Sequence, residues 1–185
     1  WLARLLIEKG GAVFVAENFE KFLSVTISNE WLARLLIEKG GAVFGAVFVA
    51  ENFEKFRIPE EKHEEFVHLI IESGGFVVEN ARAVSENFEK FRVPEDKHEE
   101  IARLIVEKGG ARAVAENFEK FLSVTISNEW LARLLIEKGG AVFGAVFVAE
   151  NAEVVAKNFE KFRIPEDKHE EIARLIIEKG GARAV

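Results

Sequence analysis

Residues 100–121 read EIARLIVEKGGARAVAENFEKF, and this stretch decides the fold. Ile101, Leu104 and Ile105 stand at positions i, i+3 and i+4, so they share one face of a helix. Lys108 closes this helix and Gly109-Gly110 follows. A basic residue in the last turn suits the helix dipole, and glycine readily adopts the left-handed conformation that ends a helix.

The residues after the glycine pair predict a second helix from Ala111 to Phe121. Val114, Phe118 and Phe121 form an apolar stripe at positions i, i+4 and i+7. Neither helix can bury its stripe alone, whereas stacked helix pairs bury a shared core. The stretch therefore predicts one unit of an all-α repeat protein.

The same unit recurs along the whole chain of 185 residues. Gly-Gly pairs occur at 10–11, 40–41, 74–75, 109–110, 139–140 and 180–181, and their first glycines are 30, 34, 35, 30 and 41 residues apart. Residues 15–52 recur unchanged as 114–151, and residues 92–114 recur as 163–185 with two Val/Ile exchanges. We therefore predict tandem helical hairpins stacked into an α-solenoid, a single array (1–185) of about six two-helix units that is incomplete at both ends.

Two kinds of connector lead from one unit to the next. One begins at Arg57, Arg92 and Arg163 and carries a proline, which fits the first turn of a helix. The other, at residues 23–30 and 122–129, reads LSVTISNE, in which Ser28 or Asn29 is expected to cap the next helix.

Some units carry insertions rich in Val and Phe after the glycine pair. These are residues 42–49 and 141–148, residues 76–80, and the later residues 152–157. We interpret them as lengthened second helices. A short strand is the alternative, because Val and Phe favour strands and Gly45 weakens a helix.

Composition and spacing argue against catalysis and against metal or cofactor binding. Cys is absent, which excludes disulfides and thiolate ligands. His63 and His68 are five residues apart rather than four, so they do not share a helix face as zinc-protease histidines do, and His63 recurs as His98 and His169 as part of the unit. No phosphate-binding glycine loop and no serine triad appear. We expect no enzyme activity, no cofactor and no metal.

The segment from Ile101 to Val114 resembles the repeats of transcription-activator-like effectors and their bacterial and marine relatives. In that family two helices flank a loop, and the two residues before Gly-Gly face the DNA major groove. The first of the two braces the loop and the second meets a base. The resemblance implies a right-handed superhelix that binds double-stranded DNA.

The resemblance assigns roles position by position. The base-facing residues would be Lys9, Lys39, Ser73, Lys108, Lys138 and Lys179, and the loop-bracing residues Glu8, Glu38, Glu72, Glu107, Glu137 and Glu178. Arg112 and Arg183 would lie near phosphate. Lysine can donate hydrogen bonds to guanine O6 and N7.

Two other interpretations stay open. Residues 98–109 also resemble the second helix of an ankyrin repeat, although the Thr-Pro-Leu-His opening of that family is missing. Glu-Lys-Gly-Gly is also an ordinary helix stop, and the array would then be a protein-binding or structural scaffold, natural or designed. Lysines on a stripe free of acids would favour DNA, and glutamates around them would favour the scaffold.

The remaining expectations come from charge, missing residue types and the chain ends. The net charge of −7 argues mildly against a nucleic-acid surface, although a solenoid can separate its charges. No apolar run is long enough for a membrane span, and no targeting peptide is seen, which favours an intracellular location. Met, Tyr and Gln are missing and both ends fall inside a repeat, as in a fragment or a restricted alphabet. We expect the exposed ends to promote self-association or low stability.

Overall fold

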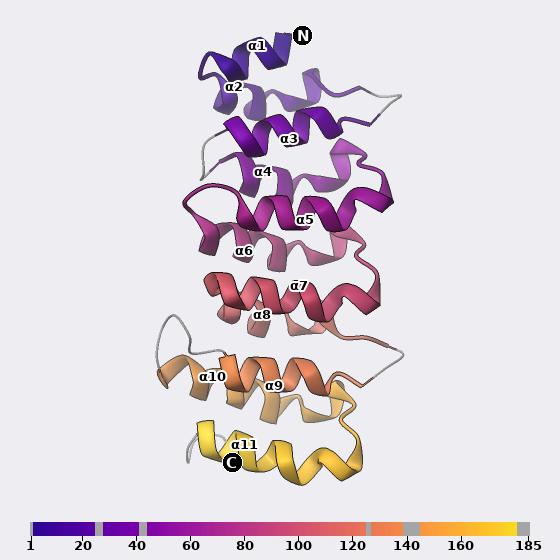
Figure 1. Ribbon diagram of the computed structural model, residues 1–185, viewed down its shortest axis with the longest axis vertical. Coiled ribbons are helices and arrows are strands. Elements are labelled where there is room, and N and C mark those ends of the chain that lie inside the picture. Colours follow the sequence, from indigo (N-terminus) through magenta and orange to yellow (C-terminus); the bar gives the residue numbers. More distant parts are fainter. Residues whose placement is uncertain (1, 25–27, 41–43, 125–126, 139–144, 181–185) are drawn as a thin grey trace. The chain divides into compact units, whose positions relative to one another are not determined.

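The computed structural model describes residues 2–24, 28–40, 44–124, 127–138 and 145–180. These residues form helices and turns and no strand, so the predicted all-α class is confirmed (Figure 1). The chain divides into two compact units, Trp1–Val93 and Pro94–Val185.

Each unit consists of helical hairpins. The first unit contains α1 (Leu2–Glu8), α2 (Ala12–Glu17), η1 (Phe19–Lys21), α3 (Glu30–Lys39), α4 (Gly45–Glu51), η2 (Phe53–Phe56), η3 (Glu60–Lys62), α5 (His63–Glu72), α6 (Val77–Glu86) and η4 (Phe88–Phe91). The second contains η5 (Glu95–Lys97), α7 (His98–Ile105), the π-helical turn η6 (Val106–Gly110), α8 (Ala111–Glu116), η7 (Phe118–Phe121), α9 (Glu129–Lys138), α10 (Ala145–Lys157), η8 (Phe159–Phe162), η9 (Glu166–Lys168) and α11 (His169–Gly180). The other η elements are 3₁₀-helices.

Consecutive hairpins pack on one another inside each unit. In the first unit α1 contacts α3, and α2 and α6 both contact α4. In the second unit α9 contacts α7 and α11, and α10 contacts α8. First helices therefore lie beside first helices and second helices beside second helices, which is how a repeat protein buries stripes that one hairpin leaves open.

The apolar stripes form the core, as the sequence predicts. Ile101, Ile105, Val114 and Phe121 are fully buried, and Phe118 is almost so. Leu104 is half-buried at the edge of its stripe. Burial of such side chains is the main source of stability in a hairpin stack.

The second helix is shorter than predicted. The expected helix over 111–121 ends at Glu116, and η7 follows after Asn117. The Asn117 side chain donates a hydrogen bond to the Ala113 carbonyl at 3.0 Å. An asparagine that bonds a carbonyl four residues back offers the backbone an alternative to the helix. Asn18, Asn52, Asn87 and Asn158 make the same bond at the same place in their hairpins.

The described parts of the insertions are helical. The start of α4 is formed by Gly45–Val49, and the end of α10 by Ala152–Lys157. In α6 the N-cap residue is Phe76, and the first turn is formed by Val77–Asn80. The strand alternative is therefore wrong for the described residues. The lengthening is confirmed for α6, with 10 residues, and α10, with 13, whereas α4 has 7 residues and α2, which has no insertion, has 6. Residues 42–43 and 141–144 lie outside the described residues.

Both connectors differ in detail from the prediction. Pro59, Pro94 and Pro165 precede a 3₁₀-turn with ψ near 140°, rather than lying in a helical turn. Ser28, one of the two predicted capping residues, accepts through Oγ from the backbone N of Glu30, the first residue of α3, at 3.2 Å. Asn29 stands at the N-cap position of α3, but its side chain makes no cap hydrogen bond. Its amide instead accepts from Ser24 N at 2.6 Å and donates to Ser24 O at 3.1 Å.

Candidate nucleic-acid interface

Three of the described Gly-Gly turns share one backbone geometry, whereas Gly40, which follows α3, has a φ of −71° and Gly180 is the last residue of α11. Gly10, Gly74 and Gly109 have φ values of 87°, 65° and 91°. This left-handed conformation ends the first helix and reverses the chain, and glycine adopts it without the steric cost that a Cβ brings. The predicted base-facing residues Lys9, Ser73 and Lys108 come directly before these glycines.

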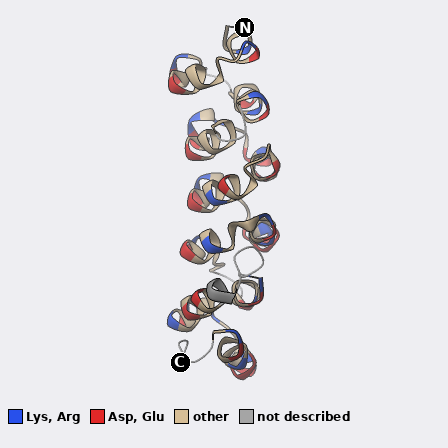
Figure 2. Cartoon of the chain, turned by 90° about the vertical axis from the view of Figure 1, so that its left-hand side faces the viewer, with Lys and Arg blue, Asp and Glu red and all other residues tan. Residues whose placement is uncertain are grey.

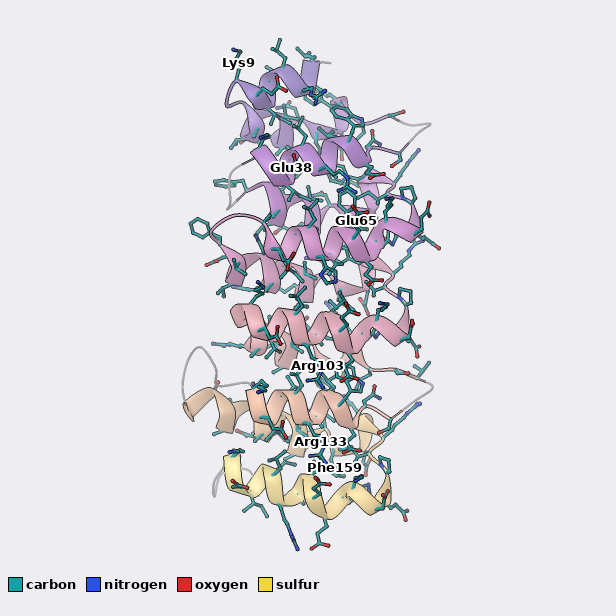
Figure 3. The ribbon with its side chains drawn as sticks, in the orientation of Figure 1. Lys9, Glu38, Glu65, Arg103, Arg133 and Phe159 are labelled. Atoms are coloured by element: carbon teal, nitrogen blue, oxygen red, sulfur yellow. The ribbon has the colours of Figure 1, made fainter. Side chains whose placement is uncertain are left out.

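The turns of each unit lie at one end of its helices, the left side in Figure 1. Side chains of Lys9 and Glu38 are labelled at these helix ends in Figure 3. Lys9, Lys39, Lys138 and Lys179 are exposed, whereas Ser73 and Lys108 are half-buried. Within each unit the structure therefore brings the predicted base-facing residues to one edge.

Most of these lysines are not engaged in ion pairs. Among the described residues, Lys9, Lys39, Lys108 and Lys138 have no carboxylate within ion-pair distance. Lys179 lies 3.8 Å from Glu178. An ammonium group without an internal partner is available to an external anion.

The predicted loop-bracing glutamates fall into two groups. Glu8 and Glu137 point back along their own helices, toward Arg4 at 3.3 Å and Arg133 at 4.0 Å. Glu38, Glu72, Glu107 and Glu178 are exposed, and Glu178 Oε1 lies 3.8 Å from Lys179 Nζ. Figure 2, which looks at this edge, accordingly shows acidic and basic segments on the same helices, so the edge is not an acid-free basic stripe.

The turn after α5 is built differently from the lysine turns. Ser73 Oγ donates a hydrogen bond to Ile70 O at 3.1 Å. The fully buried Asn80 donates through Nδ2 to Ser73 O at 2.7 Å and to Ser73 Oγ at 3.3 Å. Ser73 therefore serves the turn itself. Sequence reasoning missed Asn80, and the only signal was a polar residue inside an apolar insertion.

The predicted phosphate-binding arginines are placed as follows. Arg112 is exposed in the first turn of α8, and its Nε donates to Glu116 Oε1 at 2.7 Å. That pair holds the guanidinium along the helix. Arg183 lies outside the described residues.

A second charged feature, which the sequence did not predict, links first helices of successive hairpins. Arg34 of α3 donates to Glu30 at 3.0 Å and to Glu65 of α5 at 2.6 Å. The hydrogen bond from Arg34 lowers the pKa of Glu65, and the one to Glu65 raises the pKa of Arg34. Arg34 also lies 4.8 Å from the centre of the Phe66 ring, a cation–π contact.

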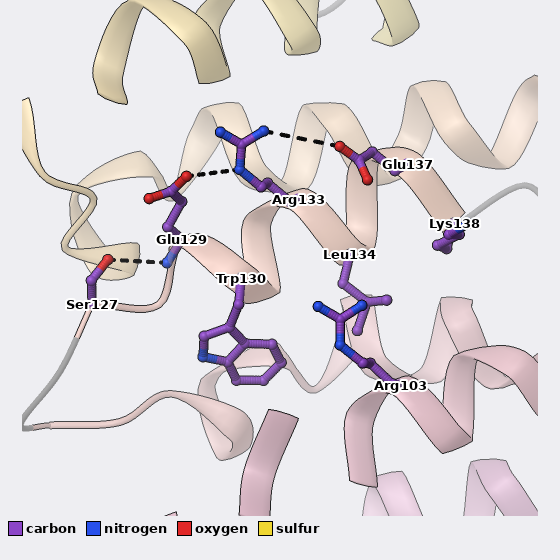
Figure 4. A pocket seen from close by; sticks show the side chains of 8 residues that line it. All are labelled: Arg103, Ser127, Glu129, Trp130, Arg133, Leu134, Glu137 and Lys138. Carbon is purple, nitrogen blue, oxygen red and sulfur yellow. Dashed lines mark hydrogen bonds and ion pairs between the residues drawn. The ribbon is translucent and has the colours of Figure 1, made fainter. Parts of the chain in front are cut away.

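The second unit repeats this bridge. Arg133 of α9 contacts Glu129 at 2.7 Å and Glu171 of α11 at 2.8 Å. The Arg133 hydrogen bond lowers the pKa of Glu171, and hydrogen bonds to Glu129 and Glu171 raise the pKa of Arg133. A groove of about 400 Å³ lies beside the bridge, and Figure 4 shows Arg103, Trp130 and Leu134 along it.

The recurrent histidines have structural contacts. His63 Nε2 lies 2.9 Å from Ile58 O, and His169 Nε2 lies 2.8 Å from Ile164 O. His98 Nδ1 lies 3.3 Å from Phe121 O. Each ring therefore ties the start of a first helix to a nearby backbone carbonyl, in line with the structural role predicted for them.

Comparisons with known proteins leave the family open. No protein-family model, no curated protein and no solved structure matches the chain. Within the described residues, no helix combines the length and the apolar character needed to cross a membrane.

Proposed function

We propose that the chain is a TALE-like α-solenoid whose Gly-Gly edge binds double-stranded DNA in the major groove. The observation that carries this proposal is the recurrence of lysines directly before the glycine pair at one edge of each unit. Lys9, Lys39 and Lys138 are exposed, and they and the half-buried Lys108 have no ion-pair partner among the described residues. The side-by-side packing of first helices in each unit supports the solenoid.

Recognition would rest on the lysines and the glycines together. A lysine ammonium can donate to guanine O6 and N7 or neutralise a phosphate. Glycine has no side chain, so the backbone of the turn can approach DNA closely. Glu8 and Glu137, which point toward arginines of their own helices, repel phosphate less than free carboxylates would.

A protein partner is the second candidate, and two observations favour it. The exposed Glu38, Glu72 and Glu107 add negative charge to the edge that DNA would approach. The same helix ends of the first unit also carry exposed aromatic rings, Phe44 at 61% and Phe76 at 44%. Exposed aromatic side chains are frequent anchors of protein interfaces.

A matched pair of variants tests the DNA proposal. One combines K9Q, K39Q, K108Q and K138Q at the Gly-Gly edge, and its control combines K21Q, K55Q, K157Q and K161Q, which makes the same change in net charge elsewhere. Each is titrated against a randomised duplex-DNA pool by fluorescence anisotropy. We expect the edge variant to lose binding and the control to keep most of it.

Two outcomes would contradict the proposal. Equal losses in both variants would show that binding follows net charge alone. Intact binding by the edge variant would show that the lysines are not involved. If the parent chain does not bind DNA at low salt, the protein-partner candidate becomes the better account.

A further inference from the structure

One surface position of the first helices holds either tryptophan or glutamate. Counted back from the Gly-Gly pair, the same position is Trp31 in α3 and Trp130 in α9, but Glu65, Glu100 and Glu171 in α5, α7 and α11. Trp31 is 43% exposed, and Trp130 is half-buried. Because glutamate serves at this position in three other hairpins, the fold does not require tryptophan there.

Glutamate at this position joins neighbouring first helices. In the second unit Arg133 of α9 contacts Glu171 of α11 at 2.8 Å, and the first unit has the same bridge between α3 and α5. Where Trp130 stands instead, the corresponding Arg103 of α7 has no carboxylate of α9 within ion-pair distance. Arg103 Nε and Nη2 donate to Glu99 of the same helix, at 3.0 Å and 2.6 Å. The bridge between α7 and α9 is therefore missing.

Arg103 and Trp130 line the groove of about 400 Å³ between α7 and α9, which both belong to the second unit (Figure 4). Trp130 and Leu134 point from α9 toward α7, and Arg133 points the other way. Lys138 lines the groove at the Gly-Gly end of α9 and has no ion-pair partner among the described residues. The groove therefore offers an aromatic ring beside basic side chains.

The charges of the groove leave room for one more carboxylate. Its two acidic side chains, Glu129 and Glu137, lie 2.7 Å and 4.0 Å from Arg133. The Arg103–Glu99 pair lies at the surface, with 49% and 45% of the two side chains exposed. Exposed ion pairs contribute little to stability, so an incoming carboxylate can take the place of Glu99 at small cost. That carboxylate would do for Arg103 what Glu171 does for Arg133.

We propose that this groove binds an acidic segment of another protein, with a carboxylate paired to Arg103 and a neighbouring apolar side chain against Trp130. The carboxylate restores the bridge that glutamate makes in other hairpins, and tryptophan is a frequent anchor of protein interfaces. The same residue types recur in the first unit as Arg4, Trp31 and Lys39, where α1 packs beside α3, so we expect a second such groove there. The proposal does not depend on DNA binding at the Gly-Gly edge.

Replacing each tryptophan by the glutamate of the other hairpins tests this proposal. The variant W31E/W130E should remain helical by circular dichroism and melt no lower than the parent chain, because each new glutamate can pair with the arginine of the preceding first helix. The control V13E/V124E makes the same change in net charge at two other exposed apolar residues. The probe is a library of random peptides displayed on phage and selected on the parent chain. Fluorescence anisotropy then measures the affinity of the enriched peptides for each variant.

The proposal predicts enrichment of peptides that combine Asp or Glu with an apolar residue. Their affinity should fall at least about tenfold in W31E/W130E and change little in V13E/V124E. The variant R4Q/R103Q should also bind them more weakly, and its binding should depend less on salt. Failure to enrich acidic peptides would overturn the proposal, and so would equal losses in W31E/W130E and its control. If W31E/W130E loses binding to duplex DNA and keeps binding to the peptides, the tryptophans serve a nucleic acid and the proposal is wrong.

Discussion

Replacing Asn128 by alanine should destabilise the second unit far more than an ordinary surface change. Asn128 is fully buried, and its amide accepts from Ser123 N at 2.6 Å and donates to Ser123 O at 3.1 Å. Ser123 itself is only 3% exposed, so water cannot replace these bonds freely. Asn128 also donates through its backbone N to Phe162 O, at the end of the hairpin that α9 begins, at 2.9 Å. The side chain therefore holds the connector against the start of α9.

The magnitude follows from the two backbone groups that the substitution leaves without partners. A buried donor or acceptor that loses its partner costs about 1–3 kcal/mol, so two of them give roughly 2–6 kcal/mol in the free energy of unfolding. The matched control is N158A in the same unit. Asn158 is half-buried and makes one bond, to Val154 O at 2.9 Å, so we expect a loss of about 0.5–1.5 kcal/mol.

Urea unfolding followed by circular dichroism measures both variants. A lower midpoint with an unchanged slope reports lost stability. If N128A loses no more stability than N158A, the Asn128 side chain does not hold the connector and this reasoning is wrong.

Three further substitutions test other parts of the structure. F53A should destabilise the first unit by about 3–5 kcal/mol in urea unfolding, because Phe53 is 1% exposed and its ring centre lies 4.4 Å from that of Phe91. F44A, at an exposed ring, should change stability by less than about 0.5 kcal/mol in the same assay. G10A should lower the free energy of unfolding by about 1–2 kcal/mol, because Gly10 has a φ of 87°. G75A should be close to neutral, because a Cβ at Gly75 would meet nothing within 4 Å. Equal shifts of the melting temperature in the two variants would contradict this reasoning. E65Q should cost about 0.2–1 kcal/mol in the free energy of unfolding at neutral pH, because ionised Glu65, whose pKa is lowered, forms an ion pair with Arg34. The difference in stability between E65Q and the parent chain should vanish as the pH falls through this lowered pKa. E61Q serves as the control.

The helix pairs could be predicted from the sequence because their determinants are local. The spacing of Ile101, Leu104 and Ile105 reports a helix face directly, and the glycine pair marks where the helix stops. The same local signals placed Lys9 and Lys108 at the turns. The lengthened second helices were also predicted correctly for α6 and α10, where the insertion is part of the helix.

The features that sequence reasoning missed depend on tertiary contacts or on one side chain. Arg34 and Glu65 are 31 residues apart, so no helix periodicity relates them, and only the packing of α3 beside α5 does. The Asn29 amide could cap a helix or form hydrogen bonds with the backbone of the connector, and the residue type alone does not decide between these two roles. The early end of the second helix at Asn117 had a usable signal, an asparagine before each Phe-Glu-Lys sequence.

The salt dependence of duplex-DNA binding tests the central proposal most directly. The parent chain is titrated against the randomised duplex pool by fluorescence anisotropy at increasing salt, followed by selection from the pool. The proposal predicts an affinity that falls steeply, with a slope of about 0.9 in log affinity per log salt for each phosphate contact, and enrichment of a preferred sequence. No binding at low salt, or binding without any sequence preference, would contradict a DNA-reading Gly-Gly edge.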